Sequence, residues 1–109
     1  MDLEQLKNNL KNYKKEEIIF KRHALNSIAL RGSSKEFIIE HLLNPVKLVD
    51  FEEQGLDKYK LIFYISNSKT MILPVVLKEK RLYILTFIMR YRAWKKLVER
   101  GKNEKNGLL

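Results

Sequence analysis

The 109-residue sequence contains no cysteine and only two histidines, His23 and His41. The absence of cysteine excludes a disulfide framework, a thiol nucleophile and the common cysteine-based zinc sites. The sequence also lacks a Gly-rich phosphate loop, an EF-hand loop and a paired-carboxylate site. We therefore expect no metal and no cofactor, so that any chemistry would depend on histidine, arginine, lysine and hydroxyl side chains.

Long apolar stretches are missing as well. The longest of them, such as "MILPVVL" and "LTFIM", are far shorter than the roughly 20 residues that a membrane-spanning helix needs. The N-terminal stretch "MDLEQLKNNLKNYKK" is charged throughout and lacks the apolar segment of a secretory signal. With 45% hydrophobic and 32% charged residues, the composition is that of a globular protein. We expect a soluble cytoplasmic protein with no membrane partner.

Acidic residues are scarce in one half of the chain only. Residues 1–56 contain nine basic and nine acidic side chains, whereas residues 57–109 contain thirteen basic and four acidic ones. The whole net charge of +9 therefore lies in the second half. A localised basic field favours a polyanionic partner, because each cation that meets a phosphate releases a condensed counterion. The alternative is a lysine-rich solvated surface that serves solubility.

The first half of the chain is predicted to be mainly helical. Leucines at helical spacing predict an amphipathic helix over residues 2–13, with Asp2 as its N-cap. A short strand is expected in "EEIIFK" and a second helix over residues 22–31, with Leu25, Ile28 and Ala29 on its apolar side and Gly32 ending it. A third helix, capped by Ser33 with Glu36 in a capping box, is expected to end at "NP". The second and third helices would form an αα-hairpin.

The second half of the chain is predicted to be mainly β-structure. Four strands are expected in "VKLVDFEE", "KYKLIFYIS", "TMILPVVLK" and "RLYILTFIMR", and the short connections between them require antiparallel neighbours. Pro74 lacks an amide hydrogen, so its strand should lie at an edge or contain a bulge. The stretch "YRAWKKLVER" predicts a last helix, closed by Gly101, with Tyr91, Trp94, Leu97 and Val98 facing inward and Arg92, Lys95, Lys96 and Glu99 outward.

These elements predict an α+β fold, with helices packed on a four- to five-stranded antiparallel sheet. We expect an N-terminal amphipathic helix in residues 1–15, one main domain in residues 16–101 and a disordered tail in residues 102–109. The N-terminal helix could cover a face of the sheet, support a homodimer or have no functional role.

The stretch "KRHALNSIALRG" brings reactive side chains close together. On a helix that advances 100° per residue, His23, Ser27 and Arg31 form one polar seam. Imidazole can exchange a proton near neutral pH, and guanidinium can hold a phosphate and balance charge in a transition state. The alternative is structural: His23 would cap the strand-to-helix corner and Arg31 would neutralise the negative end of its helix. His41 is expected to be a half-buried packing residue.

A second basic stretch, "RLYILTFIMRYRAWKK", mixes cations with aromatic rings. This mixture suits phosphate contacts combined with base stacking. We expect exposed cations and rings that lie mostly in the core, because Tyr91 and Trp94 fit the inward side of the last helix. The predicted nucleic-acid-binding residues are Lys80, Arg81, Arg92, Lys95, Lys96 and Arg100.

The segment "FKRHALNSIALRGSSKEFIIEHLLNP", followed by four short strands, resembles the RelE/ParE toxin superfamily and within it the small BrnT-like domains. The ending "TFIMRYRAWKKLVERG" is similar to the last strand and helix of that family. The resemblance covers about residues 16–101. It implies an αα-hairpin packed on a compact sheet, and a metal-independent ribonuclease toxin that is held inactive by a cognate antitoxin. By position, His23, Arg31 and Arg90 match its recurring polar residues, whereas Ser27 stands where the family often has arginine.

The main hypothesis from the sequence is thus a RelE-like, RNA-directed protein, with a metal-independent endoribonuclease toxin as its most specific form. Its predicted catalytic residues are His23 for proton transfer and Arg31 and Arg90 for the phosphate, and Arg81 and Arg92 would bind further phosphates. One alternative is a non-catalytic, basic nucleic-acid-binding module. Another is a protein-interaction module that binds an acidic, antitoxin-like partner, with a homodimer formed through the N-terminal helix.

Overall fold

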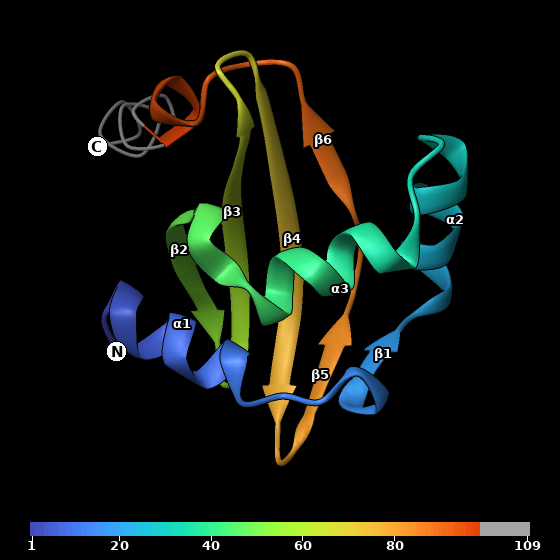
Figure 1. Cartoon of the computed structure of the whole chain (residues 1–109), viewed down its shortest axis with the longest axis vertical. Helices are drawn as coiled ribbons and strands as arrows, with labels where there is room; N and C mark the ends of the chain where they lie inside the picture. The colour runs from blue at the N-terminus through green and yellow to red at the C-terminus, as the bar shows by residue number, and fades with distance from the viewer. Residues whose placement is uncertain (99–109) are drawn as a thin grey trace.

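A computed structural model describes residues 1–98 of the chain. Over these residues the fold is α+β, as predicted, with several helices and a mixed six-stranded sheet (Figure 1). The helices are α1 (Leu3–Lys11), α2 (Arg22–Leu30) and α3 (Lys35–Leu43), with short 3-10 helices η1 (Lys15–Glu17) and η2 (Pro45–Lys47). The strands are β1 (Ile18–Phe20), β2 (Leu48–Gly55), β3 (Lys58–Ser66), β4 (Lys69–Lys78), β5 (Arg81–Ile84) and β6 (Ile88–Arg90). Residues 94–98 are also helical.

The sheet has the strand order β1-β5-β4-β3-β2, and β6 pairs with β4 beyond the end of β5. Strands β2 to β5 are antiparallel neighbours, as their short connections require. Strand β1 instead runs parallel to β5, so the prediction of a purely antiparallel sheet was wrong. About sixty residues separate β1 from β5, and so long a connection does not fix their relative direction.

The last predicted strand is split into β5 and β6 next to Pro74, so the sheet has six strands, and the predicted number of four to five was wrong. Pro74 lies in β4, which has neighbours on both sides and no register shift at this residue, so the prediction of an edge strand or a bulge was wrong. The carbonyl oxygen of Pro74 accepts a hydrogen bond of 3.0 Å from the amide of Leu85, and the position of the missing Pro74 amide hydrogen faces the same side. A continuous partner strand would need that donor. Residues 85–87 leave the strand conformation here, and Phe87 is buried in the core.

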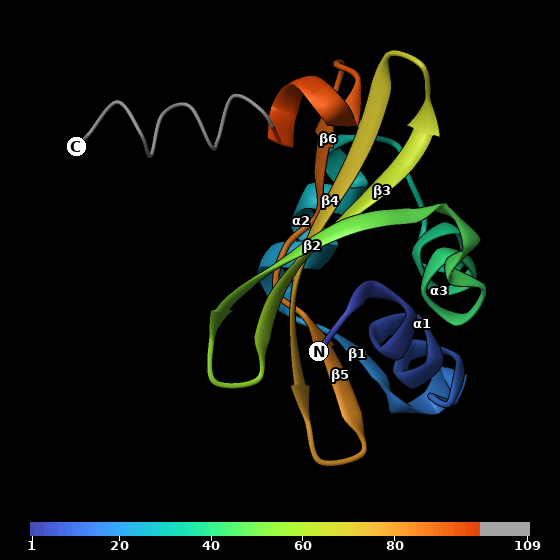
Figure 2. The same ribbon diagram turned by 90° about the vertical axis from the view of Figure 1, so that its left-hand side faces the viewer.

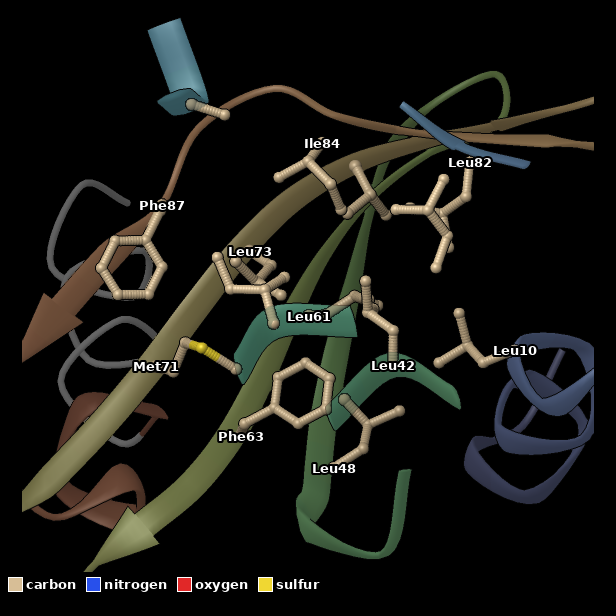
Figure 3. Close-up of a cluster of buried hydrophobic side chains, with 14 of the residues drawn as sticks. Leu10, Leu42, Leu48, Leu61, Phe63, Met71, Leu73, Leu82, Ile84 and Phe87 are labelled. Carbon is tan, nitrogen blue, oxygen red and sulfur yellow. The ribbon is translucent and has the colours of Figure 1, made fainter. Parts of the chain in front are cut away.

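Helices α1 and α3 lie on the same face of the sheet (Figure 2). Asp2 caps α1, as predicted, and forms a capping box with Gln5. Leu6 and Leu10 of this helix are fully buried in the same core as the strand residues. Side chains of α3 and of the sheet strands interlock in this core (Figure 3). Its labelled members are Leu10, Leu42, Leu48, Leu61, Phe63, Met71, Leu73, Leu82, Ile84 and Phe87.

Helix α2 lies outside this layer, beyond the edge of the sheet (Figure 1). Its buried side consists of Ala24 and Ile28, whereas Leu25 and Ala29 are exposed, so the predicted apolar side was partly wrong. A helix at a sheet edge buries only a narrow stripe, and the predicted side was too wide. Gly32 ends the helix in the left-handed conformation, with a φ of 65°, as predicted.

The N-cap of α3 is Ser34 rather than Ser33, because the side chain of Ser34 accepts a hydrogen bond from the amide of Phe37. The predicted capping box between Ser33 and Glu36 was therefore wrong. Helix α3 ends before "NP", as predicted, with Asn44 as its C-cap. None of the helices within residues 1–98 is long and apolar enough to span a membrane. Glu99, Arg100, Gly101 and the predicted tail in residues 102–109 lie outside the described residues.

Candidate nucleic-acid interface

Arg31 lies at the C-terminal end of α2, where the chain turns sharply. It is the C-cap residue, and the next two amides bond back to the helix, Gly32 to the carbonyl of Ala29 and Ser33 to that of Ile28. This pair of bonds is a Schellman motif, which fixes the direction in which the chain leaves the helix. Arg31 is exposed at the C-terminal end of the helix, where a cation is stabilised.

Strand β6 brings Arg90 to the same place. A hollow of about 540 Å³ lies between the end of α2 and β6, and both arginines line it. Its lining residues are Ser27, Leu30, Arg31, Thr86, Phe87, Ile88, Arg90 and Tyr91. Two of the three predicted catalytic residues are therefore brought together although they are far apart in sequence.

Two further hollows adjoin the first. One of about 500 Å³ shares Arg31, Arg90 and Tyr91 with it and adds Arg92. The other, of about 460 Å³, is lined by Tyr91, Arg92 and Lys96 together with residues of the β3–β4 turn. We call the surface formed by Arg31, Arg90, Tyr91, Arg92 and Lys96 the basic groove. It carries four cations around one aromatic ring.

Tyr91 is 69% exposed, so the prediction that its side chain faces inward was wrong. Residues 91–93 are not helical, and the last helix begins only at residue 94. The buried hydroxyl of Thr70 donates a hydrogen bond of 2.7 Å to the carbonyl of Arg92, which fixes this segment to β4. The ammonium of Lys69 lies 5.6 Å from the centre of the Tyr91 ring. A signal was present in the sequence, because "RYR" places the ring between two cations that are costly to bury.

His23 is not among the residues that line the basic groove. It lies exposed in the first turn of α2, eight residues before Arg31, which corresponds to about 12 Å along a helix. The hydroxyl of Ser27 donates to the carbonyl of His23 and lies 3.3 Å from the hydroxyl of Thr86. Of the predicted seam, Ser27 and Arg31 thus face the hollow, and the His23 side chain is separate from it.

The other predicted nucleic-acid-binding residues are divided between the two ends of the sheet. Lys96 is part of the groove, whereas Lys95 is exposed next to it, with its ammonium 5.9 Å from the centre of the Trp94 ring. Lys80 and Arg81 lie at the β4–β5 turn, roughly 26 Å away along β4 at 3.3 Å per residue. Arg100 lies outside the described residues.

His41 has a structural role, as predicted. Its Nδ1 lies 2.8 Å from the carbonyl oxygen of Phe37, which can only accept, so Nδ1 carries the hydrogen. The imidazole ring also packs against the rings of Phe37 and Phe63, with centroid distances of 4.4 and 6.0 Å. The imidazole of His41 therefore serves packing within the fold.

Another hollow, of about 600 Å³, lies beneath the end of α1, and no sequence motif indicated it. Tyr13 and Tyr59 line it together with Glu17, Asp57 and Lys80. Burial, and then the charges of Glu17 and Asp57, raise the pKa of Tyr13. Burial also raises the pKa of Tyr59, with smaller contributions from Glu53 and Asp57. The hollow forms where the β2–β3 and β4–β5 turns approach α1. No local sequence pattern predicts how these segments pack together.

Within residues 1–98, no group of three or more His, Asp or Glu side chains is arranged to hold a metal ion. Compared with known proteins, the chain matches no family model, no curated protein and no solved structure. The resemblance to RelE-like proteins therefore depends on the short motif around His23 and Arg31 and on the order of the elements.

Proposed function

We propose that this chain is an RNA-directed, RelE-like protein that binds RNA in the basic groove. The observation that carries the proposal is that Arg31 and Arg90, from separate elements, line one hollow beside the exposed ring of Tyr91. Guanidinium groups hold phosphate oxygens in bidentate fashion. An exposed aromatic ring offers a stacking surface for an unpaired base, worth about 1–3 kcal/mol. The combination suits RNA better than it suits a small anion.

A RelE-like arrangement is part of this proposal, with α3 packed on the sheet and α2, the other arm of the hairpin, at the sheet edge (Figures 1 and 2). In that arrangement the end of α2 and the last strand supply the two arginines of the groove. The His-Ala-Leu and Arg-Gly elements of the motif support it, as does the position of Arg90 after an apolar strand.

Binding is favoured over cleavage by the position of His23. A metal-independent ribonuclease needs a base near the 2′-hydroxyl, an acid near the leaving oxygen and cations around the phosphate. Arg31 and Arg90 are suited to the last task, which supports an endoribonuclease toxin as the second candidate function. The His23 imidazole would have to act from the opposite end of α2, about 12 Å along the helix from Arg31.

Binding is tested with a labelled single-stranded RNA and fluorescence anisotropy. We expect the affinity to fall steeply between about 50 and 200 mM salt. The Tyr91→Ala, Arg31→Gln and Arg90→Gln variants should each weaken binding, by about 1–3 kcal/mol for the tyrosine. The matched control is Lys14→Gln, which removes an exposed cation beside α1, away from the groove. Equal affinity of all five proteins, or no binding at low salt, would contradict the proposal.

Cleavage is tested separately by incubating RNA with the protein in EDTA. If the groove is catalytic, the parent protein cuts the RNA, Arg90→Ala loses the activity, and His23→Ala reports whether the imidazole takes part. Intact RNA in every lane, with binding retained, leaves a non-catalytic RNA-binding module.

A protein partner is the remaining alternative, because four cations and an exposed tyrosine also suit an acidic, antitoxin-like chain. Co-purification of such a chain through the same groove would be disrupted by Arg31→Gln. If RNA binds and no acidic chain is recovered, the RNA-directed function stands alone.

A further inference from the structure

The face of the sheet opposite α1 and α3 is covered by no helix in its lower half within the part of the chain that the structure describes (Figure 2). Side chains alternate along each strand, so the neighbours of buried residues point to this face. Leu82 and Ile84 are buried in the core, which places Arg81 and Tyr83 on the uncovered face. On β4, the core residues Leu73 and Val75 place Pro74 and Val76 there in the same way.

The aromatic ring of Tyr83 lies on this face next to the cation of Lys21. It lies directly opposite Val76 of β4, in a row that continues to Ile19 of β1. The ammonium of Lys21 lies 5.0 Å from the centre of the Tyr83 ring. The phenol is only partly exposed, yet the pair resembles Lys69 and Tyr91 at the basic groove in chemistry. Each pair combines a stacking surface with a contact for phosphate.

Cations lie at both ends of this side of the sheet: at the free end of the uncovered half, and beyond its other limit, where Thr70 and Ile72 of β4 are buried. Lys78 and Arg81 are exposed partners at the β4–β5 end, and Arg90 is exposed at the other end, opposite Thr70. Between them β4 and its neighbours offer Pro74, Val76 and Tyr83, which form a surface of apolar and aromatic groups without a carboxylate. Within residues 1–98, the carboxylates of this face lie on β2, where Glu52 pairs with Lys60 at 3.5 Å. The electrostatic path for a polyanion therefore follows β4 and β5.

We propose that this uncovered face extends the basic groove, so that the ligand is a single strand of RNA that runs from Arg90 across Tyr83 to Arg81. The proposal rests on the proposed RNA-binding function. A path of roughly 26 Å along β4 suits a site of about four nucleotides or more, within the range known for single-strand-binding folds. A duplex is excluded as the preferred ligand, because its paired bases offer no free faces to Tyr83 and Tyr91.

The first test is a length series of single-stranded RNAs of two, four, six and eight nucleotides. If the strand crosses the sheet, affinity rises up to about six nucleotides and the salt dependence steepens by about 0.7 for each added phosphate contact. If the groove alone binds RNA, affinity and slope level off at the shortest lengths. That second result overturns the extension and leaves the proposed function in place.

The second test compares two cations of the same turn. Arg81 lies on the uncovered face, whereas Lys80 lines the hollow beneath α1 on the other side. Arg81→Gln and Tyr83→Ala should weaken binding of the eight-nucleotide RNA about fivefold or more and leave binding of the shortest RNA unchanged. Lys80→Gln should leave both unchanged. Equal effects of Arg81→Gln and Lys80→Gln would overturn the path.

A third variant and a duplex separate the remaining outcomes. Tyr91→Ala should weaken binding at every length, because the groove is common to all ligands. If the parent protein binds none of the RNAs, the proposed function fails. If it binds an RNA duplex tightly, only the single-strand inference fails. Circular dichroism melts of each variant, compared with the parent, verify that Tyr83→Ala retains the fold.

Discussion

The hydroxyl oxygens of Ser27 and Thr86 lie 3.3 Å apart and connect α2 to the link between β5 and β6. Because Ser27 donates its hydrogen to the carbonyl of His23, Thr86 is the donor in the contact between the two hydroxyls. This short chain of hydrogen bonds holds the wall of the basic groove.

Replacing Ser27 with alanine should destabilise the protein by about 0.5–1.5 kcal/mol, the usual net contribution of a hydrogen bond. The loss arises because the partly buried hydroxyl of Thr86 loses the acceptor that Ser27 provides. Urea unfolding measures the change, and Ser27→Thr, which retains the hydroxyl, is the control. An unchanged unfolding midpoint in Ser27→Ala would show that the contact contributes nothing to stability.

Replacing Ser27 with arginine should add a further cation to the hollow that Arg31 and Arg90 line. If the proposed function is correct, RNA binding strengthens and its salt slope steepens by about 0.7, which is one more phosphate contact. Ser27→Gln, a side chain of intermediate length without charge, separates the charge from the bulk. Weaker binding by Ser27→Arg at low salt would argue against phosphates in this hollow.

The bond from Thr70 to the Arg92 carbonyl should control how Tyr91 is presented. Thr70→Val keeps the shape of the buried side chain and removes its donor, so stability should fall by about 0.5–1.5 kcal/mol. RNA affinity should fall further than in Thr70→Ser, which keeps the hydroxyl. Denaturation and anisotropy on the same samples measure both quantities. If Thr70→Val and Thr70→Ser bind RNA equally, the tether does not position the ring.

Helix α1 should be needed for the stability of the whole domain. Leu6 is fully buried in the common core, so Leu6→Ala should cost about 2–5 kcal/mol. Asp2→Ala leaves the core unchanged and removes the N-cap side chain, at a cost of about 1 kcal/mol. Sedimentation at several concentrations tests the predicted homodimer. If Leu6→Ala alters association and leaves the unfolding free energy unchanged, the helix serves self-association instead of the core.

Local signals in the sequence were sufficient for most elements of the fold. Gly32 could be placed at the end of α2 because only a left-handed residue completes the turn, and the antiparallel pairs follow from turns too short for any other direction. The parallel pairing of β1 and the split at Pro74 could not be predicted. Both depend on which distant strand lies beside them, and that choice is made by the packing of the core.

The candidate site was predictable only in part for the same reason. Arg31 and Arg90 were identified from a motif, and their meeting in one hollow needs the β6 segment to pass the end of α2. Tyr91 was assigned to the core because helical periodicity was extended three residues too far. The hydrogen bond from Thr70 to the carbonyl of Arg92 keeps this segment from joining the last helix. It connects residues 22 positions apart, so no local sequence pattern predicts it.

Because Tyr13 lines the hollow beneath α1, we expect the protein to lose stability at alkaline pH. The pKa of Tyr13 is raised above 10.0 by burial and then by the nearby charges of Glu17 and Asp57. Below pH 10 the phenol is neutral in both the folded and the unfolded chain, so its contribution to stability is fully present. Above that pH the unfolded chain loses the proton first, and stability is lost as the pH rises through the raised pKa.

Urea unfolding at about pH 8 and about pH 11 measures this loss. Tyr13→Phe should lose less stability over this interval than the parent protein, since it has no phenol to ionise beside Glu17. Glu17→Gln should lower the pKa of Tyr13, which phenolate absorbance measures. The measurement uses a Tyr59→Phe background, because the pKa of Tyr59 is raised by similar causes. If Tyr13→Phe and the parent lose stability equally, burial of Tyr13 has no part in the alkaline transition.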